Sequence, residues 1–328
     1  MATNTINENV EQAILDFGTI KQAIIDKGVE VPDGTPTSQY ATKIGEIQSG
    51  GSSSDDFKGI VERTVTEVAL PSDCTTVGDY AFYKYSNLTS VDIPESVTSI
   101  GFSAFCDCTN LALTSLPSGL TSIGNNAFNY CEKLALTSLP DGVTSIGDSA
   151  FQSCTNLALT SLPEGITSIG DYAFQSCTNL ALTSLPEGIT SIGDYAFQNC
   201  TNLALTSLPI SLTIIRDSAF GYCKNLAITS IPSGITSIRN EAFRDCTSLA
   251  LTSLPEGLTS IGSNAFRHCT GLTEITFEGT PTSLSSSAFN NCTNLTTIRV
   301  PWAEGEVAGA PWGALNASLI YSYTPETT

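Results

Sequence analysis

Apolar side chains recur along most of this chain with a period of 23 residues. An alanine-phenylalanine pair marks every unit, and no insertion interrupts the series. The phenylalanines of this column are Phe82, Phe105, Phe128, Phe151, Phe174, Phe197, Phe220, Phe243, Phe266 and Phe289. A constant period over ten units predicts a repeat protein in which every unit adopts the same local structure.

The apolar spacing within one unit predicts the elements of a coil. In residues 157–179 the apolar positions match neither the alternation of a long strand nor the period of a long helix. Residues 157–162 and 166–169 are predicted to form two short strands joined by a proline-glycine turn. Asp171 is predicted to be the N-cap of one helical turn that carries Phe174. The apolar side chains then converge inside the coil.

A single coil of this kind cannot fold alone. Its few apolar side chains do not offset the entropy lost when 23 residues become ordered, so stability must come from stacking on neighbouring coils. With coils about 4.8 Å apart, ten of them would form a rod or arc roughly 50 Å long.

Two further columns follow the same period. Cysteines recur three residues after the phenylalanines, from Cys108 to Cys292, and prolines recur from Pro71 to Pro255. The units therefore read I-G-x-x-A-F-x-x-C-x-x-L followed by a strand that ends in proline. This pattern resembles the BspA-type leucine-rich repeats over residues 61–301. The resemblance implies a solenoid of ten 23-residue coils, built from short β-strands and helical turns, that binds a partner and is not an enzyme.

One unit keeps the family's commoner strand sequence. Residues 88–94 read L-T-S-V-D-I-P, whereas most later units read L-A-L-T-S-L-P at the same length.

The segments outside the repeats define four regions. Residues 1–49 carry apolar side chains at helical spacing and are predicted to be a small α-helical module for attachment or oligomerisation. Residues 50–57 are predicted to be a glycine-serine linker, residues 58–300 the solenoid, and residues 301–328 a capping segment. Trp302 and Trp312 are predicted to cover the last coil, because a solenoid must shield its terminal apolar surface.

The flanking segments carry a second resemblance. The stretch K-Q-A-I-I-D-K-G-V-E-V-P-D-G-T-P-T-S-Q-Y-A-T-K-I-G-E-I resembles modules in tail-associated proteins of phages that infect gut Firmicutes. Residues 301–317 resemble the closing segment of such repeat proteins. These resemblances imply a phage tail-associated, receptor-binding protein of the virion that recognises a glycan or protein on the bacterial surface. The alternative is a BspA-like bacterial surface adhesin. The N-terminal module is expected to bind a tail protein and to form either a trimeric stalk or a small helical hairpin.

Charge and hydropathy exclude several partners. The chain has 13 basic and 32 acidic residues, a net charge of -19, which disfavours binding to nucleic acid or to anionic membranes. No apolar run approaches the roughly 20 residues of a membrane span. The first ten residues lack the features of a signal peptide, which predicts assembly in the host cytoplasm.

The candidate chemistry favours structural roles, and we predict no catalytic residue, cofactor or metal. The single histidine, His268, is adjacent to Cys269, but neighbouring side chains on extended backbone diverge. The cysteine column is interpreted as buried thiols instead of a metal or disulfide ladder. An aspartate column that includes Asp171 is interpreted as helical N-caps instead of a calcium site.

Positions that vary between otherwise uniform coils are free to bind a partner. Tyr172 and Tyr195 share one such column, and Tyr130 and Tyr222 share another. Exposed tyrosines suit contacts with sugars or proteins, while the alternative is stacking along the solenoid.

A second candidate group is basic. Arg216 and Arg239 replace the glycine that follows isoleucine, and Arg244 and Arg267 share the position after phenylalanine. They are predicted to meet an acidic glycan or protein. The favoured alternative is surface ion pairing with Asp217, Glu241 and Asp245.

Overall fold

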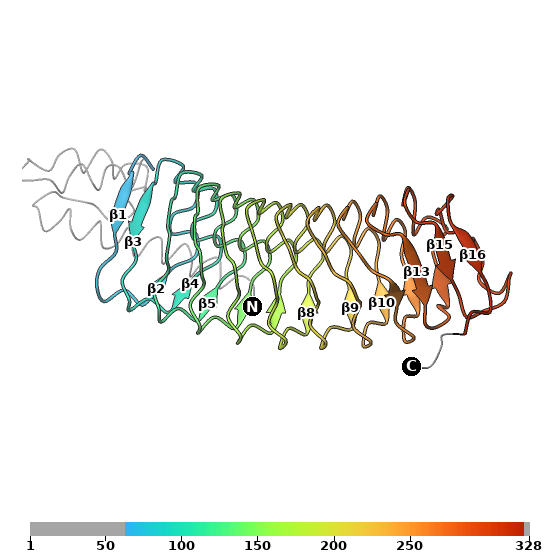
Figure 1. Cartoon of the computed structure of the whole chain (residues 1–328). Helices are drawn as coiled ribbons and strands as arrows, with labels where there is room; N and C mark the ends of the chain where they lie inside the picture. The colour runs from blue at the N-terminus through green and yellow to red at the C-terminus, as the bar shows by residue number, and fades with distance from the viewer. Residues whose placement is uncertain (1–62, 325–328) are drawn as a thin grey trace, which may run out of the picture.

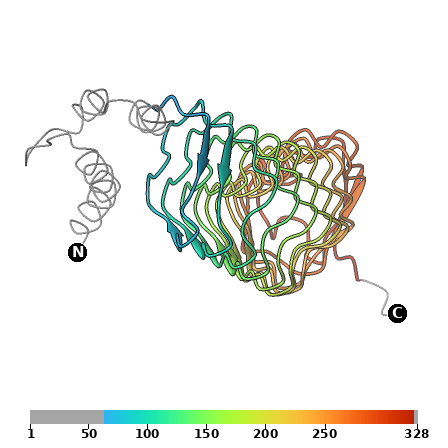
Figure 2. The same ribbon diagram turned by 90° about the vertical axis from the view of Figure 1, so that its left-hand side faces the viewer.

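The computed structural model describes residues 63–324, which form a solenoid of about eleven stacked coils (Figure 1). Viewed from the side of the first coil, successive coils lie one behind the other around a continuous interior (Figure 2). The repeat solenoid predicted from the sequence is therefore confirmed. The α-helical module predicted at residues 1–49 and the linker at 50–57 lie outside the described residues.

Short parallel strands run along the sides of the solenoid, and paired strands are offset by one repeat. Ser168 pairs with Ser191 and Ile169 with Ile192, for example. Most strands have two residues because only one serine-isoleucine pair per coil is extended. The six-stranded sheet contains β2 (Thr76–Val77), β4 (Ser99–Ile100), β5 (Ser122–Ile123), β6 (Ser145–Ile146), β7 (Ser168–Ile169) and β8 (Ser191–Ile192). A second sheet contains β9 (Ile214–Ile215), β10 (Ser237–Ile238), β12 (Ser260–Ile261) and β14 (Ser283–Leu284).

A second segment of the repeat forms strands only towards the two ends of the solenoid. They are β1 (Glu67–Ala69) and β3 (Ser90–Asp92), and then β11 (Ser253–Leu254), β13 (Glu274–Phe277), β15 (Thr297–Arg299) and β16 (Ser318–Ile320). The predicted strand at 166–169 is confirmed in part by β7, but the strand predicted at 157–162 is absent. The same sequence L-A-L-T-S-L-P contains the short strand β11, which pairs with the regular strand β13 of the next coil, so the neighbouring coil decides whether this segment becomes a strand.

The helical turn predicted after Asp171 is wrong, and no helix occurs among residues 63–324. Tyr172 and Ser176 have left-handed backbone, with φ of 58° and 61°. The N–H groups of Tyr172, Phe174 and Ser176 each donate to a carbonyl of the next coil at 2.8 Å. A helix would direct these groups to its own preceding turn, so bonding between coils replaces helix formation here.

Asp171 is also not an N-cap. Its Oδ1 accepts a hydrogen bond from the N–H of Asp194, in the next coil, at 2.8 Å. The same bond links Asp148 to Asp171 and Asp194 to Asp217, and Asn240 donates from its N–H to Asp217. The aspartate column is therefore an acceptor ladder that joins successive coils.

Phenylalanine and cysteine columns fill the interior. Successive phenylalanine rings are stacked with centroids 5.1 to 5.7 Å apart, and all but the first are almost fully buried. Each cysteine thiol in the column donates to a phenylalanine carbonyl of the preceding coil, as Cys177 does to Phe151 at 2.9 Å. All eleven cysteines are free thiols, and those of the column are buried.

The C-terminal segment closes the stack with a coil of different sequence. β16 pairs with β15, which extends the parallel arrangement by one step. Trp302 and Trp312 are buried, and their rings lie 5.2 and 6.1 Å from the ring of Phe277. These tryptophans cover the interior of the preceding coil.

The serine-isoleucine sheet is interrupted between β8 and β9. At this unit, Ser211 and Arg216 stand where the preceding unit has Gly188 and Gly193. The second glycine column lies against the preceding coil, because a Cβ on Gly193 would lie 2.5 Å from the backbone nitrogen of Asp171. Arg216 introduces such a Cβ, but Arg239 does so in the next coil, where β9 and β10 remain paired, so the Cβ alone does not account for the interruption.

A pair of glycines in one coil tests this close approach. A Cβ on Gly170 would lie 2.5 to 2.7 Å from atoms of Asp148 and Gly147, whereas a Cβ on Gly165 would lie 3.8 Å or more from the atoms of the preceding coil. We expect Gly170→Ala to lower the free energy of unfolding by about 1–3 kcal/mol. Gly165→Ala should leave it unchanged or slightly higher. Urea denaturation measures both, and equal effects would contradict the proposed contact.

Because the thiols are buried, we expect the protein to lose stability at high pH. Burial raises the pKa of Cys292 from 9.0 to about 12, against a weaker opposing effect of a backbone hydrogen bond. The protonated thiol is thus favoured in the folded state, so its contribution is complete below pH 9 and is lost as the pH rises towards 12. Above pH 9 this thiol should lower the free energy of unfolding by up to about 1.4 kcal/mol per pH unit. Urea denaturation of Cys292→Ala under reducing conditions should show a correspondingly shallower pH dependence, and an unchanged slope would contradict the assignment.

Candidate functional site

Two columns of left-handed residues form the variable surface of the solenoid. Residues in this backbone region lie on either side of each buried alanine-phenylalanine pair, and their side chains are exposed or half-buried except at Ser103 and Ser218, which are buried. We call the two columns together the left-handed ridge. The first column holds Tyr80, Ser103, Asn126, Ser149, Tyr172, Tyr195, Ser218, Glu241 and Asn264. The second holds Lys84, Asp107, Tyr130, Ser153, Ser176, Asn199, Tyr222, Asp245, His268 and Asn291.

The backbone of the ridge makes its tyrosines notable. Left-handed backbone costs a residue with a side chain roughly 1–2 kcal/mol, and asparagine and aspartate tolerate it best. Asparagine or aspartate occupies six of the nineteen ridge positions, and serine occupies five. Tyrosine nevertheless occupies five of them: Tyr80, Tyr130, Tyr172, Tyr195 and Tyr222. An unfavourable backbone conformation retained at an exposed position is a basis for a functional hypothesis.

The structure brings Tyr172 and Tyr195 together. Their rings are stacked, with centroids 4.8 Å apart and planes within 4° of parallel. Tyr172 is 36% exposed, and the pair is flanked along its column by Ser149 and Ser218. Burial, followed by the nearby Tyr172 and the acidic groups, raises the pKa of Tyr195. Tyr195 therefore stays neutral at ordinary pH.

The other two candidate tyrosines lie apart from each other. Tyr130 and Tyr222 share a column but belong to coils four repeats apart. Tyr130 is 45% exposed, while the ring of Tyr222 lies 5.1 Å from the guanidinium of Arg244. The structure thus places Tyr222 beside the basic group instead of beside Tyr130.

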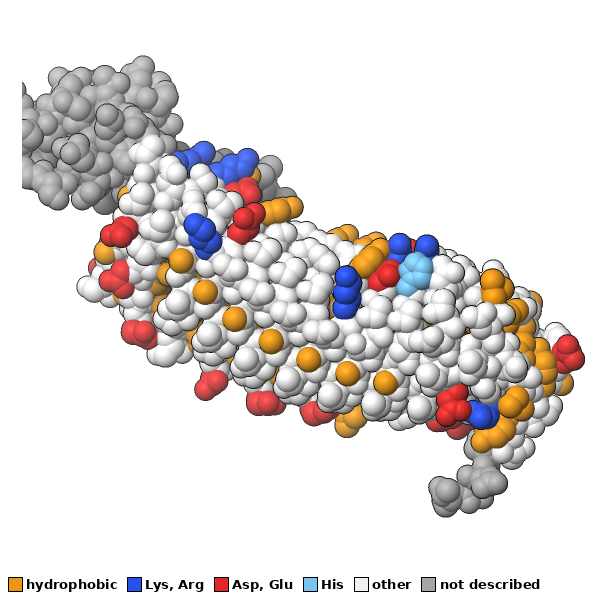
Figure 3. All heavy atoms as spheres, turned by 45° about the horizontal axis from the view of Figure 1, so that its top comes forward, with side chains coloured by type: hydrophobic (Ala, Val, Ile, Leu, Met, Phe, Trp, Pro, Cys, Tyr) orange, Lys and Arg blue, Asp and Glu red, His pale blue; other side chains and the backbone are white. Residues whose placement is uncertain are grey.

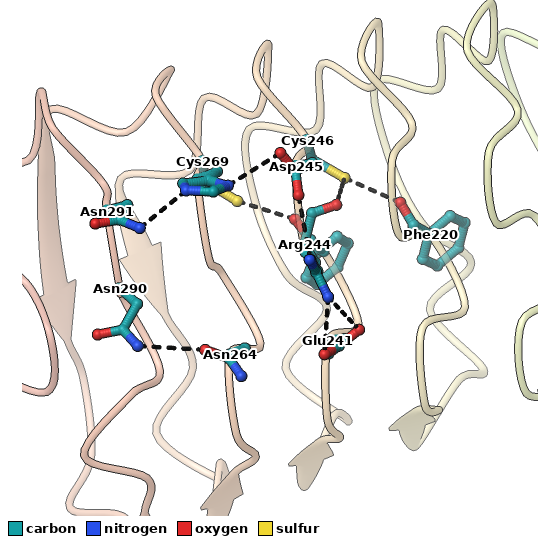
Figure 4. Close-up of polar contacts among 11 residues, drawn as sticks. Phe220, Glu241, Arg244, Asp245, Cys246, Asn264, Cys269, Asn290 and Asn291 are labelled. Atoms are coloured by element: carbon teal, nitrogen blue, oxygen red, sulfur yellow. Dashed lines mark hydrogen bonds and ion pairs between the residues drawn. The ribbon is translucent and has the colours of Figure 1, made fainter.

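Arg244 is the centre of a charged cluster (Figure 4). Its Nη1 lies 3.0 Å from Glu241 Oε2 and its Nε lies 3.2 Å from Asp245 Oδ2. Burial opposes the charge of this guanidinium, but the bonds to both carboxylates outweigh it and raise the pKa of Arg244. His268 continues the cluster, with Nδ1 3.1 Å from Asp245 Oδ1 and Nε2 2.9 Å from Asn291 Nδ2. Pairing of Arg244 with Glu241 and Asp245 matches the alternative favoured from the sequence.

The remaining candidate arginines do not join this ion-pair cluster. Within residues 63–324, no ion pair is described for Arg216, Arg239 or Arg267. Arg267 has a buried Nε without a hydrogen-bond partner. Figure 3 shows the histidine beside basic and acidic side chains, while uncharged side chains cover most of that face. The four arginines therefore do not form one continuous basic site through direct contacts.

His268 and Cys269 do not form a dyad. Cys269 Sγ donates inward to the carbonyl of Phe243 at 3.0 Å, whereas His268 is bonded on the outside. The part of the chain that the structure describes contains no group of three or more histidine, cysteine or acidic residues placed to hold a metal ion. No helix of that part is long and apolar enough to cross a membrane.

Two features of the ridge surface were missed from the sequence. Gln152, Gln175 and Gln198 form an amide ladder, in which Nε2 of one donates to Oε1 of the next at 2.5 and 2.6 Å. Tyr80, 46% exposed, packs against Phe102 with ring centroids 5.2 Å apart. The signal for the ladder was glutamine at three successive 23-residue steps, and Tyr80 shares the column of Tyr172.

Comparison with known proteins supports the repeat assignment. A family model described as BspA type Leucine rich repeat region (6 copies) matches residues 57–181 and 167–296. No curated protein matches the sequence.

Among solved structures, a leucine-rich repeat protein from Bacteroides ovatus is 24% identical, over 78% of this chain and 69% of that chain, with a TM-score of 0.53. One from Eubacterium ventriosum is 20% identical over 89% and 77%, with a TM-score of 0.47. A leucine rich cell surface protein from Faecalibacterium prausnitzii is 24% identical over 73% and 89%, with a TM-score of 0.42. The likeness to the Bacteroides protein shows a shared fold. Together with the family match over most of the chain, it leads to one assignment: this chain belongs to the BspA-type leucine-rich-repeat family.

Proposed function

We propose that this protein is a non-catalytic recognition protein, in which the part of the left-handed ridge that carries Tyr130, Tyr172, Tyr195 and Tyr222 binds a glycan or protein on a bacterial surface. The observation that carries the proposal is the retention of exposed tyrosines in left-handed backbone, where asparagine would be less strained. Tyrosine supplies a large, rigid contact area with little loss of side-chain entropy on binding. The strain is therefore offset when the rings contact a partner.

The separation of interior and ridge positions within each coil supports a binding role. Phenylalanine, alanine and cysteine positions are committed to the interior, where each contacts the neighbouring coils. The ridge positions have no such commitment and vary from coil to coil. A partner can thus be recognised by ridge side chains without disturbing the stack.

We further propose that the chain acts in a phage tail, where residues 1–49 attach it to a virion protein, with a homotrimer as one arrangement. The resemblance of residues 21–47 to phage tail-associated modules motivates this proposal. The alternative is a bacterial surface adhesin, which membership of the BspA-type family favours. An antibody against the solenoid would label the tails of virions in the first case and the cell envelope in the second.

Replacing the ridge tyrosines tests the binding role. We expect a variant with Tyr130, Tyr172, Tyr195 and Tyr222 changed to asparagine to lose binding to bacterial cells. Its free energy of unfolding should stay within about 2 kcal/mol of the unmodified protein, because lost ring contacts and relieved backbone strain oppose each other. Labelled full-length protein, applied to a panel of gut bacterial strains, measures binding.

The control for this variant removes exposed apolar side chains outside the ridge. Ile210 is 76% and Leu315 is 86% exposed, and neither belongs to the ridge columns. A variant with both changed to asparagine should bind the same strains as the unmodified protein. Undiminished binding by the ridge variant would refute the proposal.

A further inference from the structure

One part of the ridge surface carries no charge. In each coil, the ridge surface comprises the side chains of the two ridge positions and of the residue after phenylalanine. In the windows 126–130, 149–153, 172–176, 195–199 and 218–222, these side chains are asparagine, serine, glutamine, tyrosine or glycine only. We call this surface the uncharged field. A chain with a net charge of -19 thus keeps five consecutive coils free of charge at these positions.

The borders of the uncharged field are well defined. Asp107 precedes it in the second ridge column, and Glu241 and Asp245 follow it. Tyr130 lies in its first coil and Tyr222 in its last. Four steps between coils give it a length of roughly 20 Å. The acceptor ladder of aspartates runs beside the field, one residue before each window, and disfavours an anionic ligand there.

Tyr172 and Tyr195 form an aromatic platform with one open face. Their own stacking uses one face of each ring. Beyond Tyr195 the column continues with Ser218, which is buried, so that side of the platform is closed. Beyond Tyr172 it continues with Ser149, which has no ring and is half-buried. Ring stacking along this solenoid repeats at about the coil spacing, as the 4.8 Å separation of the two tyrosines shows. The Ser149 side therefore leaves room for one flat ring against Tyr172.

The amide ladder provides regularly spaced hydrogen-bonding groups beside this platform. Each amide has two N–H donors and two acceptor lone pairs, and the ladder uses one N–H of Gln152 and one of Gln175. The remaining donors and lone pairs recur once per coil. At the first coil of the field, Asn129 Oδ1 is buried without a hydrogen-bond partner. Its Nδ2 donates to Asn126 Oδ1 at 3.1 Å.

From these contacts we propose that the uncharged field is a binding site for a neutral polysaccharide chain, which deepens the proposed function and rests on it. A pyranose ring would stack its C–H face on the open side of Tyr172, which Tyr195 supports from behind, and hydroxyl groups of the chain would bond to the glutamine and asparagine amides. The coil spacing is close to the length of one sugar unit, so successive units meet equivalent groups. A protein partner is less favoured, because protein interfaces anchor large side chains in pockets. The described hollows, lined by residues 91–95 with 112–117 and by 67–69 with 90–92, lie outside the field.

The experiment uses the full-length chain and soluble polysaccharides as probes. Native gel electrophoresis through gels that contain mannan, dextran, galactan or mixed-linkage β-glucan measures retardation, and polygalacturonate serves as the acidic probe. We expect retardation by at least one neutral polysaccharide, with little dependence on salt because no charge takes part. Tyr172→Asn with Tyr195→Asn should weaken this binding roughly tenfold to a hundredfold.

A matched control is available in the same column. Tyr80 is also left-handed and exposed but lies outside the uncharged field, so Tyr80→Asn should leave the affinity within about twofold. Asparagine already occupies this column at Asn126 and Asn264, so these variants retain a backbone-compatible residue.

The outcomes separate this inference from the proposed function. If the protein binds bacterial cells, but no neutral polysaccharide retards it or competes with the cells, the inference is wrong and the proposed function stands. The inference would also be wrong if polygalacturonate alone retarded the protein. It would likewise be wrong if protease treatment of the cells abolished binding and neutral polysaccharides did not compete for it. Retardation by a neutral polysaccharide that the double variant loses and Tyr80→Asn retains would uphold it, whichever strains the protein binds.

Discussion

The structure depends on contact between coils that are 23 residues apart. Within one coil, short turns provide some backbone hydrogen bonds, such as that from Gln175 N–H to the carbonyl of Tyr172. The other contacts join coils: amide groups after each aspartate donate to the next coil, phenylalanine rings stack on their counterparts, and cysteine thiols donate to the preceding coil. The contacts of the three columns are thereby shared by neighbours. A constant repeat length follows from this, because an insertion would move all three columns out of register at once.

The same arrangement decides where the coil presents variable side chains. Alternate amides in residues 172–176 bond to the next coil, which holds Tyr172 and Ser176 in left-handed backbone. The inward positions between them are filled by Ala173 and Phe174. The outward positions are then exposed at regular intervals along the solenoid. A repetitive scaffold thus produces a repetitive surface, which suits a ligand that is itself repetitive.

Local sequence changes divide this surface into regions of different chemistry. Five coils carry only uncharged side chains at the ridge positions and at the position after phenylalanine. In the coils that follow, Arg244, Glu241, Asp245 and His268 form a bonded charged cluster. The serine-isoleucine sheet is interrupted near this boundary, where Arg216 replaces a strand-end glycine. The stack tolerates this interruption because the phenylalanine and cysteine columns continue through it.

The sequence by itself determined the solenoid, its repeat length, the inward columns and the variable positions. The reason is that stacked coils bury the same positions of every 23-residue unit. The sequence predicted Phe174 and Cys177 as interior residues and Tyr172 with Tyr195 as neighbours. Only the tertiary structure decided that Asp171 bonds to the next coil instead of capping a helix, and that residues after it are left-handed. Both features depend on hydrogen bonds between residues 22 to 24 apart in the sequence. The acceptors of these bonds come into place only when the coils have stacked. The local preference of Asp171 for an N-cap was therefore overridden by bonds that a single unit cannot form.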